Sequence, residues 1–214
     1  MIAPILQGPS CFSPDLSPFA VQSNSTATST SFSEPYCNYD VFLSFRGEDT
    51  RKNFTDHLYF ALVQLKIRTF RDDEELPRGK TISTELLSAI HGSKISIVIF
   101  SENYASSRWC LDELVEIVHC KNTKGHTLLP ICYHVDPSDV RNQTGTFAGA
   151  FAWHEEQFQT DMERVQKWKE ALTDAANCSG WDLKCIANGY YTMDSSLYFF
   201  IHFFFFVLLF SCKF

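Results

Sequence analysis

The segment ISIVIFSENYASSRWCLDELVE, which spans Ile95 to Glu116, decides the fold because it holds a strand, a loop and a helix in immediate succession. Its first six residues are almost continuously apolar, which is typical of a strand buried on both faces. After a short polar loop, a helix is predicted to begin near Arg108 or Trp109, because apolar residues then recur at helical spacing, at Leu111, Leu114, Val115 and Val118. In an open α/β sheet, ligands bind outside the carboxyl ends of the strands, so this loop and the first helical turn are predicted to face a crevice.

Two side chains of this helix are candidates for chemistry. Trp109 and Glu113 are four residues apart, so a helix places them on the same face, one turn apart. Glu113 lies off the apolar stripe, and on spacing alone it also fits a solvated acid like its neighbours Asp112 and Glu116. Trp109 likewise fits either a ligand contact or an aromatic side chain that packs the helix onto the domain. Spacing alone leaves both alternatives open.

Composition limits the class of protein. The chain has 214 residues, of which 45% are hydrophobic, and this length favours one domain with flanking segments over two full domains. The net charge of −7 provides no basic surface for nucleic acid, so no nucleic-acid partner is expected. The eight cysteines include no CxxC pair and no Cys/His pair at zinc spacing. They are interpreted as reduced thiols of a cytoplasmic protein without a metal site.

The order of the other segments predicts a doubly wound α/β fold. YDVFLSF (39–45) is an apolar strand, and the polar segment RGEDT after it offers Asp49 or Thr50 as a helix cap. Further strands are predicted at 67–70 and 127–135, the latter with Pro130 at an edge or bulge, and no fifth strand is evident. Other helices are predicted from the cap to Lys66 and over 81–90, 147–158 and 162–176, with DPSDVRNQTGTF (136–147) as a loop. Alternation of this kind forms a mostly parallel sheet flanked by helices.

Single positions exclude two other classes. The tripeptide GKT at 79–81 resembles the end of a phosphate-binding P-loop, but that motif requires a glycine where this chain has Glu74. A phospho-acceptor receiver domain requires an aspartate at the end of the third strand, and this strand ends in Phe100 and Ser101. Neither an ATPase nor a receiver is therefore predicted.

The two ends of the chain differ from the predicted domain in composition. Residues 1–37 are rich in Ser, Thr and Pro without Lys or Arg, so they are interpreted as a disordered leader. Residues 185–214 form a Phe-rich hydrophobic tail, whose apolar run Leu197 to Phe210 is about fourteen residues, short of the roughly twenty that span a bilayer core. We hypothesise that this tail is translated intron sequence. An uninterrupted coding exon through Phe214 would instead favour membrane attachment through residues 197–210.

Five motifs in the same order resemble the TIR domain of plant intracellular immune receptors. They are YDVFLSFRGEDTR (39–51), RDDEELPRGKTI (71–82), SENYASSRWCLDEL (101–114), YHVDPSDVRNQTGTF (133–147) and WKEAL (168–172). The resemblance covers residues 38–184 and implies a flavodoxin-like fold. Plant members of this family include NAD glycohydrolases whose activity triggers defence signalling, and their catalytic glutamate matches Glu113. The resemblance therefore implies an NAD hydrolase of innate immunity, with NAD as substrate and no metal.

The resemblance also implies roles for other residues. Arg46, Gly47 and Trp109 are expected near the bound NAD, although Arg46 also fits a loop arginine in solvent. The loop 71–80, with Asp72, Pro77 and Gly79, matches the mobile BB loop of the family, in which a glycine would supply hinge freedom. His57 and Trp168 are expected at surfaces of self-association.

Two functions from different classes follow. The first is a self-associating NAD hydrolase. The second is a non-catalytic adaptor or decoy that pairs with other TIR-containing immune receptors, in the cytoplasm or nucleus. The family often has serine before the histidine that matches His57, and here that residue is Asp56. Two such aspartates near a symmetry axis would repel each other, which favours weaker self-association.

Overall fold

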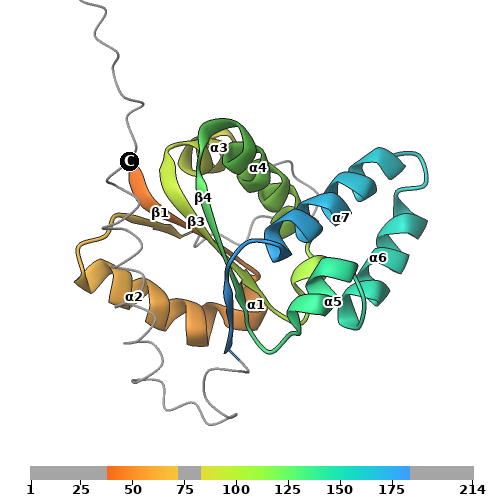
Figure 1. Ribbon diagram of the computed structural model, residues 1–214, viewed down its shortest axis with the longest axis horizontal. Coiled ribbons are helices and arrows are strands. Elements are labelled where there is room, and N and C mark those ends of the chain that lie inside the picture. The colour runs from red at the N-terminus through yellow and green to blue at the C-terminus, as the bar shows by residue number, and fades with distance from the viewer. Residues whose placement is uncertain (1–37, 72–82, 184–214) are drawn as a thin grey trace, which may run out of the picture. The chain divides into compact units, whose positions relative to one another are not determined.

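The computed structural model describes residues 38–71 and 83–183, which form a parallel sheet with helices on both faces (Figure 1). Its five strands lie in the order β2-β1-β3-β4-β5, and every neighbouring pair is parallel. Their bounds are β1 Tyr39–Phe45, β2 Thr69–Arg71, β3 Ser93–Phe100, β4 Thr127–Cys132 and β5 Trp181–Asp182. The predicted flavodoxin-like, doubly wound class is confirmed.

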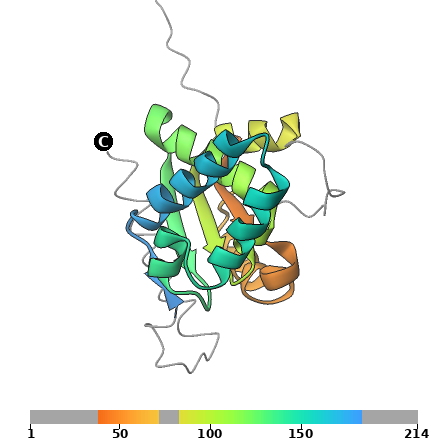
Figure 2. The ribbon, with the colours of Figure 1, turned by 90° about the vertical axis from the view of Figure 1, so that its right-hand side faces the viewer.

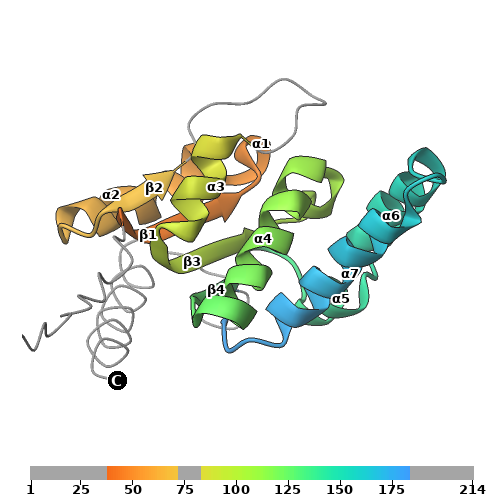
Figure 3. The same cartoon turned by 90° about the horizontal axis from the view of Figure 1, so that it is seen from above.

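The helices divide between the two faces of the sheet. Their bounds are α1 Gly47–Thr50, a π-helical segment Arg51–Thr55, α2 Asp56–Gln64, α3 Thr84–His91, a 3₁₀ turn Tyr104–Ser106, α4 Arg108–Lys124, α5 Pro137–Asn142, α6 Thr146–Gln157 and α7 Met162–Ala176. In Figures 1 and 3, α2 lies on one face, and α3 and α4 lie on the other. Helices α5, α6 and α7 form a group that faces the viewer in Figure 2.

Each central strand contributes side chains to two separate cores. On the α2 side, Leu58 and Leu62 pack with alternate residues of the sheet, including Val41, Leu43, Ile97 and Ile131. On the other side, apolar residues of α3, α4 and α7 pack with the intervening strand residues, including Phe42, Val98 and Phe100. This double burial explains why β1 and β3 are apolar along nearly their whole length.

Side-chain caps fix where the helices begin. Ser83, Ser107, Asp136 and Asp161 each accept a hydrogen bond from a backbone N–H in the first turn of α3, α4, α5 and α7. Helix α4 ends at Gly125, whose φ of 69° suits a residue without a Cβ. The cap at Ser107 sets the start of α4, and thereby the height of Glu113 beside the sheet.

The helix predicted from residue 50 to Lys66 is interrupted. Asn53 has φ −137° and ψ −105°, so the chain is kinked within the π-helical segment that lies between α1 and α2. Neither Asp49 nor Thr50 caps a helix through its side chain, because Asp49 lies within α1 and its carboxylate bonds elsewhere. The second strand, predicted at 67–70, is observed at Thr69–Arg71.

Three further differences occur in the second half of the domain. The predicted loop contains α5, which starts with a cap at Asp136 followed by Pro137 in the first turn. Strand β4 ends at Cys132 instead of residue 135, and His134 shortly beyond it has a positive φ of 60°. A fifth strand is present, but it pairs with β4 only at Ile131 and Cys132. Pro130 therefore lies within β4, just before the β5 pairing, and not on an edge strand.

Several sequence predictions fall outside the described residues: the leader at 1–37, the loop residues Asp72, Pro77 and Gly79, and the tail at 185–214. Within residues 38–71 and 83–183, none of the helices combines the length and apolarity required to cross a bilayer.

Replacement of glycine by alanine is expected to change the free energy of unfolding in opposite directions at Gly180 and Gly149. A Cβ at Gly180 would lie 2.3 Å from the carbonyl oxygen of Pro130, whereas a Cβ at Gly149 in α6 would meet no atom within 4 Å. Gly180→Ala should lower the free energy of unfolding by about 1–3 kcal/mol, because backbone must move. Gly149→Ala should raise it by about 0.5–1 kcal/mol, because alanine loses less entropy in a helix. Urea denaturation followed by circular dichroism tests both, and equal shifts for the two variants would contradict the prediction.

His126 predicts a loss of stability in mild acid. The ring is buried, its Nε2 lies 2.8 Å from Ser96 Oγ, and burial lowers the pKa of His126 to about 4. The unfolded chain binds this proton near pH 6.5, so stability should fall as pH drops from 6.5 towards 4, by about 3 kcal/mol at most. His126→Gln should flatten this part of the pH profile of unfolding free energy, whereas His119→Gln at an exposed site of α4 should not. Parallel profiles for wild type and His126→Gln would refute the assignment.

Candidate functional site

The candidate site lies where the chain changes direction across the sheet. From β1 the chain runs outward to β2 and then returns to β3 on the other side of β1. The connections after β1 and β3 therefore diverge to opposite faces, and such a switch point is where doubly wound sheets bind ligands. The segments that border it are residues 46–50 after β1 and residues 101–107 after β3.

Glu113 is buried beside this switch point. It lies in the second turn of α4 with only 4% of its surface exposed, so its interpretation as a solvated helical acid is wrong. Its Oε2 accepts a 2.9 Å hydrogen bond from Ser44 Oγ, near the carboxyl end of β1. An ionised carboxyl is costly to bury unless other groups solvate it. Strongly desolvated acids of this kind are concentrated at functional sites.

A buried tyrosine completes the surroundings of Ser44. Tyr104 OH lies 3.1 Å from Ser44 Oγ and donates a 3.0 Å hydrogen bond to the carbonyl oxygen of Cys110. The Tyr104 ring packs edge-on against Phe100, with 5.0 Å between the centroids. Ser44, Tyr104 and Glu113, from a strand, a 3₁₀ turn and a helix, thus form one hydrogen-bonded group, called here the Ser44 network.

Burial keeps the other acidic protons of this region in place. Burial raises the pKa of Tyr104 well above its usual value, and the nearby Cys110 and Glu113 raise it further. Burial and then the charge of Glu113 likewise raise the pKa of the Cys110 thiol, which donates to the carbonyl oxygen of Phe45 at 3.5 Å. The Tyr104 hydroxyl and the Cys110 thiol therefore keep their protons, and a protonated thiol is a poor nucleophile.

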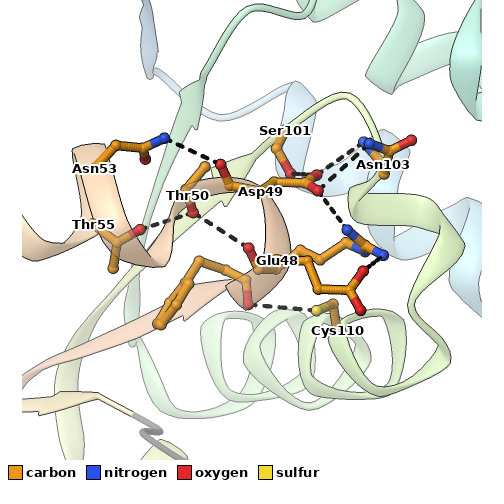
Figure 4. Close-up of polar contacts among 10 residues, drawn as sticks. Glu48, Asp49, Thr50, Asn53, Thr55, Ser101, Asn103 and Cys110 are labelled. Atoms are coloured by element: carbon orange, nitrogen blue, oxygen red, sulfur yellow. Dashed lines mark hydrogen bonds and ion pairs between the residues drawn. The ribbon is translucent and has the colours of Figure 1, made fainter. Parts of the chain in front are cut away.

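Asp49 connects the two segments that border the switch point (Figure 4). Its Oδ2 accepts hydrogen bonds from Ser101 Oγ at 2.6 Å and from the backbone N–H of Asn103 at 3.1 Å. Burial raises the pKa of Asp49, but the Ser101 hydroxyl, the Arg46 charge and the Asn103 N–H together outweigh it, so the pKa is lowered. Asp49 therefore remains charged and holds the residues after β1 against those after β3.

Arg46 and Gly47 lie at the predicted edge of the sheet. The Arg46 guanidinium pairs with Glu48 and Asp49, and its side chain is only 21% exposed, so it is not a loop arginine in free solvent. Gly47 begins α1, and a Cβ there would lie 2.9 Å from Arg51 Nη2. No group of three or more His, Cys, Asp or Glu side chains able to hold a metal ion occurs in the described part of the chain.

The remaining candidates of the helices have different surroundings. Trp109 is partly buried and packs against the core on the α4 side. This position fits the alternative in which its aromatic side chain packs the helix onto the domain. His57 is exposed on α2, with the exposed Phe60 one turn further along. Asp56 Oδ1 lies 2.5 Å from Arg71 Nη1, so its charge is balanced and the expected repulsion between two copies of Asp56 is reduced.

The expected role of Trp168 in self-association is wrong. Its side chain has 0% exposure, and its indole Nε1 donates a 2.8 Å hydrogen bond to Asp112 Oδ1. Arg164 Nη2 lies 2.5 Å from the other oxygen of the same carboxylate. Trp168 therefore fixes α7 against α4 and has no surface to offer a partner.

Sequence reasoning missed Ser44, Tyr104 and Asp49 as members of the site. Ser44 gave a signal, because it is a small polar residue inside an otherwise apolar segment of β1. Asp49 and Tyr104 stand in polar segments, where nothing local indicates burial. Asp49 is 52 residues from Ser101 in sequence and Tyr104 is 60 residues from Ser44, so only the fold brings these pairs together.

Plant disease resistance proteins contain a segment that is similar in sequence to this chain. The chain is 57% identical over 159 residues to disease resistance protein RPV1 of Vitis rotundifolia, and 57% identical over 143 residues to TMV resistance protein N of Nicotiana glutinosa. These matches cover 74% and 67% of this chain but only 11% and 12% of the relatives. The chain thus matches a small part of each relative.

A solved structure and a protein family also match this chain. The TIR domains in the structure of the activated Roq1 resistosome, which directly recognises the pathogen effector XopQ, superpose with a TM-score of 0.71 at 48% identity. The match covers 77% of this chain and 98% of that one. Residues 38–190 match the family described as TIR domain. The chain therefore belongs to the TIR domain family, with close relatives among plant disease resistance proteins.

Proposed function

We propose that this chain hydrolyses NAD at the bond between nicotinamide and ribose, as a signal in plant immunity. The observation that carries the proposal is the burial of Glu113 at the switch point of the sheet, held by Ser44. Glu113 also occupies the position that matches the catalytic glutamate of the NAD-cleaving members of the family. A buried acid with a fixed orientation suits a reaction that develops positive charge.

The chemistry requires one carboxylate and no general acid. As the bond from C1′ to the ring nitrogen breaks, its electron pair goes to nicotinamide, which leaves as a neutral molecule. The ribose then carries positive charge on C1′ and the ring oxygen, and the Glu113 carboxylate would offset it from a fixed position. Water adds to C1′ and loses a proton, which gives ADP-ribose. Most glycosidases need a second carboxyl to protonate the leaving group, and here the leaving group is already cationic.

The residues after β1 supply further candidate contacts for this substrate. The guanidinium of Arg46 pairs with Glu48 and Asp49, so the charges of these two carboxylates are engaged within the protein. Arg46 and Gly47 are proposed to contact the ribose or the nearer phosphate, and Trp109 to border the same site.

Self-association is proposed through α2. This helix exposes His57, Phe60 and Val63, and Phe60 and Val63 are 59% and 45% exposed. Exposed apolar side chains on one helix are typical of a surface that contacts a partner. The Roq1 TIR domains were solved within an activated resistosome. The same surface would serve the second candidate function, a non-catalytic module that pairs with TIR domains of other immune receptors.

Glu113→Gln tests the proposed reaction. Glutamine keeps the size of the side chain and can still accept from Ser44, but it removes the negative charge. Release of nicotinamide from NAD should fall by at least about 100-fold, because the electrostatic stabilisation of the ribose cation is lost. Chromatography of nicotinamide after incubation of the purified full chain at high protein concentration measures this.

Glu116→Gln is the matched control. Glu116 lies on the same helix, and its carboxylate is 3.7 Å from His91 Nε2, away from Ser44. This variant should retain turnover within about twofold, since it removes an equal charge outside the site. Wild-type turnover by Glu113→Gln would contradict the assignment. No nicotinamide release by the wild-type chain under any of these conditions would favour the non-catalytic module.

Phe60→Glu tests the proposed surface of self-association. A carboxylate in an apolar contact loses burial and adds charge, so the dissociation constant between copies should rise at least about tenfold. Trp153→Glu makes the same change on α6, where Trp153 is 49% exposed, and should leave association unchanged. Sedimentation velocity over a range of protein concentrations compares the three proteins. Loss of association in Trp153→Glu but not in Phe60→Glu would place the surface on α6 instead.

A further inference from the structure

Ser44 is an unusual residue for its position in the fold. It has 0% exposure in β1, one residue before the end of this strand, and pairs in register with Val98 of β3. Its neighbours on the same face of the sheet, Phe42 and Phe100, belong to the hydrophobic core against α4. A β-branched apolar residue would suit such a strand better than serine does. The fold alone therefore gives no reason for a hydroxyl at this position.

The hydroxyl of Ser44 is committed to Glu113. A carboxylate oxygen can only accept, so in the 2.9 Å contact Ser44 Oγ donates its single proton to Glu113 Oε2. Tyr104 OH lies 3.1 Å from the same Ser44 Oγ. The Tyr104 ring is itself held by Phe100 and by the carbonyl of Cys110. Ser44 therefore has a fixed rotamer and a fixed direction of donation.

We propose that Ser44 is a positioning residue for Glu113, whose hydroxyl holds the carboxylate in the orientation that faces the substrate. This inference rests on the proposed function, because it assigns Ser44 a part in NAD hydrolysis. The strand supplies the rigidity, since β1 pairs with strands on both sides. A carboxylate held by a strand keeps its position more precisely than one held by a loop.

A second buried serine provides a matched comparison. Ser96 lies on β3 with 0% exposure, and its hydroxyl contacts a titratable side chain, Nε2 of His126, at 2.8 Å. Phe42 of β1 pairs in register with Ser96, so the two serines lie on neighbouring strands and on the same side of the sheet. Substitution of either serine by alanine removes one buried hydroxyl and its contact with a titratable side chain, and at Ser44 it also removes the 3.1 Å contact with Tyr104. Of the two serines, only Ser44 contacts Glu113.

The charged and titratable groups around Glu113 come from several elements and are engaged with one another. Among the residues that the structure describes, they include Tyr104 of the 3₁₀ turn, Cys110 on α4, the pair Arg46 and Asp49 after β1, the pair Asp112 and Arg164 between α4 and α7, and the pair Glu116 and His91 between α4 and α3. A change at Ser44 alters none of these pairs. A changed titration of the Glu113 carboxyl would therefore report the lost hydrogen bond.

The kinetic test compares Ser44→Ala, Ser44→Thr and Ser96→Ala in the full chain. Ser44→Ala should lower kcat for nicotinamide release by about tenfold to 100-fold with KM within about twofold, because the carboxylate is misplaced in the transition state. Ser44→Thr, which keeps a hydroxyl and suits a strand, should recover most of this loss. Ser96→Ala should leave both constants within about twofold. An unchanged kcat in Ser44→Ala would overturn the inference while the proposed function stood.

A second measurement is independent of turnover. Carboxyl-¹³C-labelled protein allows the Glu113 signal, assigned by its absence in Glu113→Gln, to be followed by NMR as a function of pH. Ser44→Ala should move the midpoint of this titration upward by about one pH unit, since a hydrogen bond to the charged form favours that form. Ser96→Ala should not move it. If the wild-type chain releases no nicotinamide, the proposed function fails, and the titration then tests the role of Ser44 by itself. A shifted midpoint in Ser44→Ala supports Ser44 as the group that holds Glu113. An unchanged midpoint overturns this role of Ser44.

Discussion

The contact between Ser44 and Glu113 joins strand β1 to helix α4, which packs on the sheet, across 69 residues of sequence. It is a constraint as well as a contact, because a desolvated carboxylate requires donors at fixed positions. Strand β1 must end beside the second turn of α4 for the hydroxyl to reach. The cap at Ser107, which sets the first turn of α4, and the packing of Tyr104 on Phe100 both serve this geometry. Several contacts around β1 and β3 therefore fix the position of the buried Glu113 carboxyl group.

The loops above the sheet are organised by a second carboxylate of different character. Asp49 is surrounded by donors from Ser101, Asn103 and Arg46, so its charge is already satisfied within the protein. Such an acid is suited to holding loops together and poorly suited to meeting a substrate. The two acids therefore have different roles at the switch point: Asp49 fixes the segments that border it, and Glu113 is the acid proposed for the chemistry. Both lie where β1 and β3 send the chain to opposite faces.

The sequence predicted the elements whose pattern is local and missed those that depend on distant partners. Strand β1 and helix α7 were predicted with their observed bounds, because continuous apolarity and a clear helical stripe suffice for them. Strand β5 is only a two-residue pairing with Ile131 and Cys132, which no local pattern encodes. Helix α5 could have been found, since Asp136 followed by Pro137 is a helix start. The burial of Glu113 was missed because α4 was assumed to pack on one side, whereas it contacts the sheet, α3 and α7.

Adjacent acids of α4 show which charge the fold requires. Asp112 and Glu113 differ by about 100° around the helix, so they face different neighbours. Asp112 accepts from Trp168 and pairs with Arg164, and it thereby fixes α7 to α4. Glu113 instead accepts a hydrogen bond from Ser44 on β1, at the switch point of the sheet. Asp112 thus joins two helices, whereas Glu113 is buried where a doubly wound sheet binds its ligand, and this difference in location is the physical ground for assigning the chemistry to Glu113.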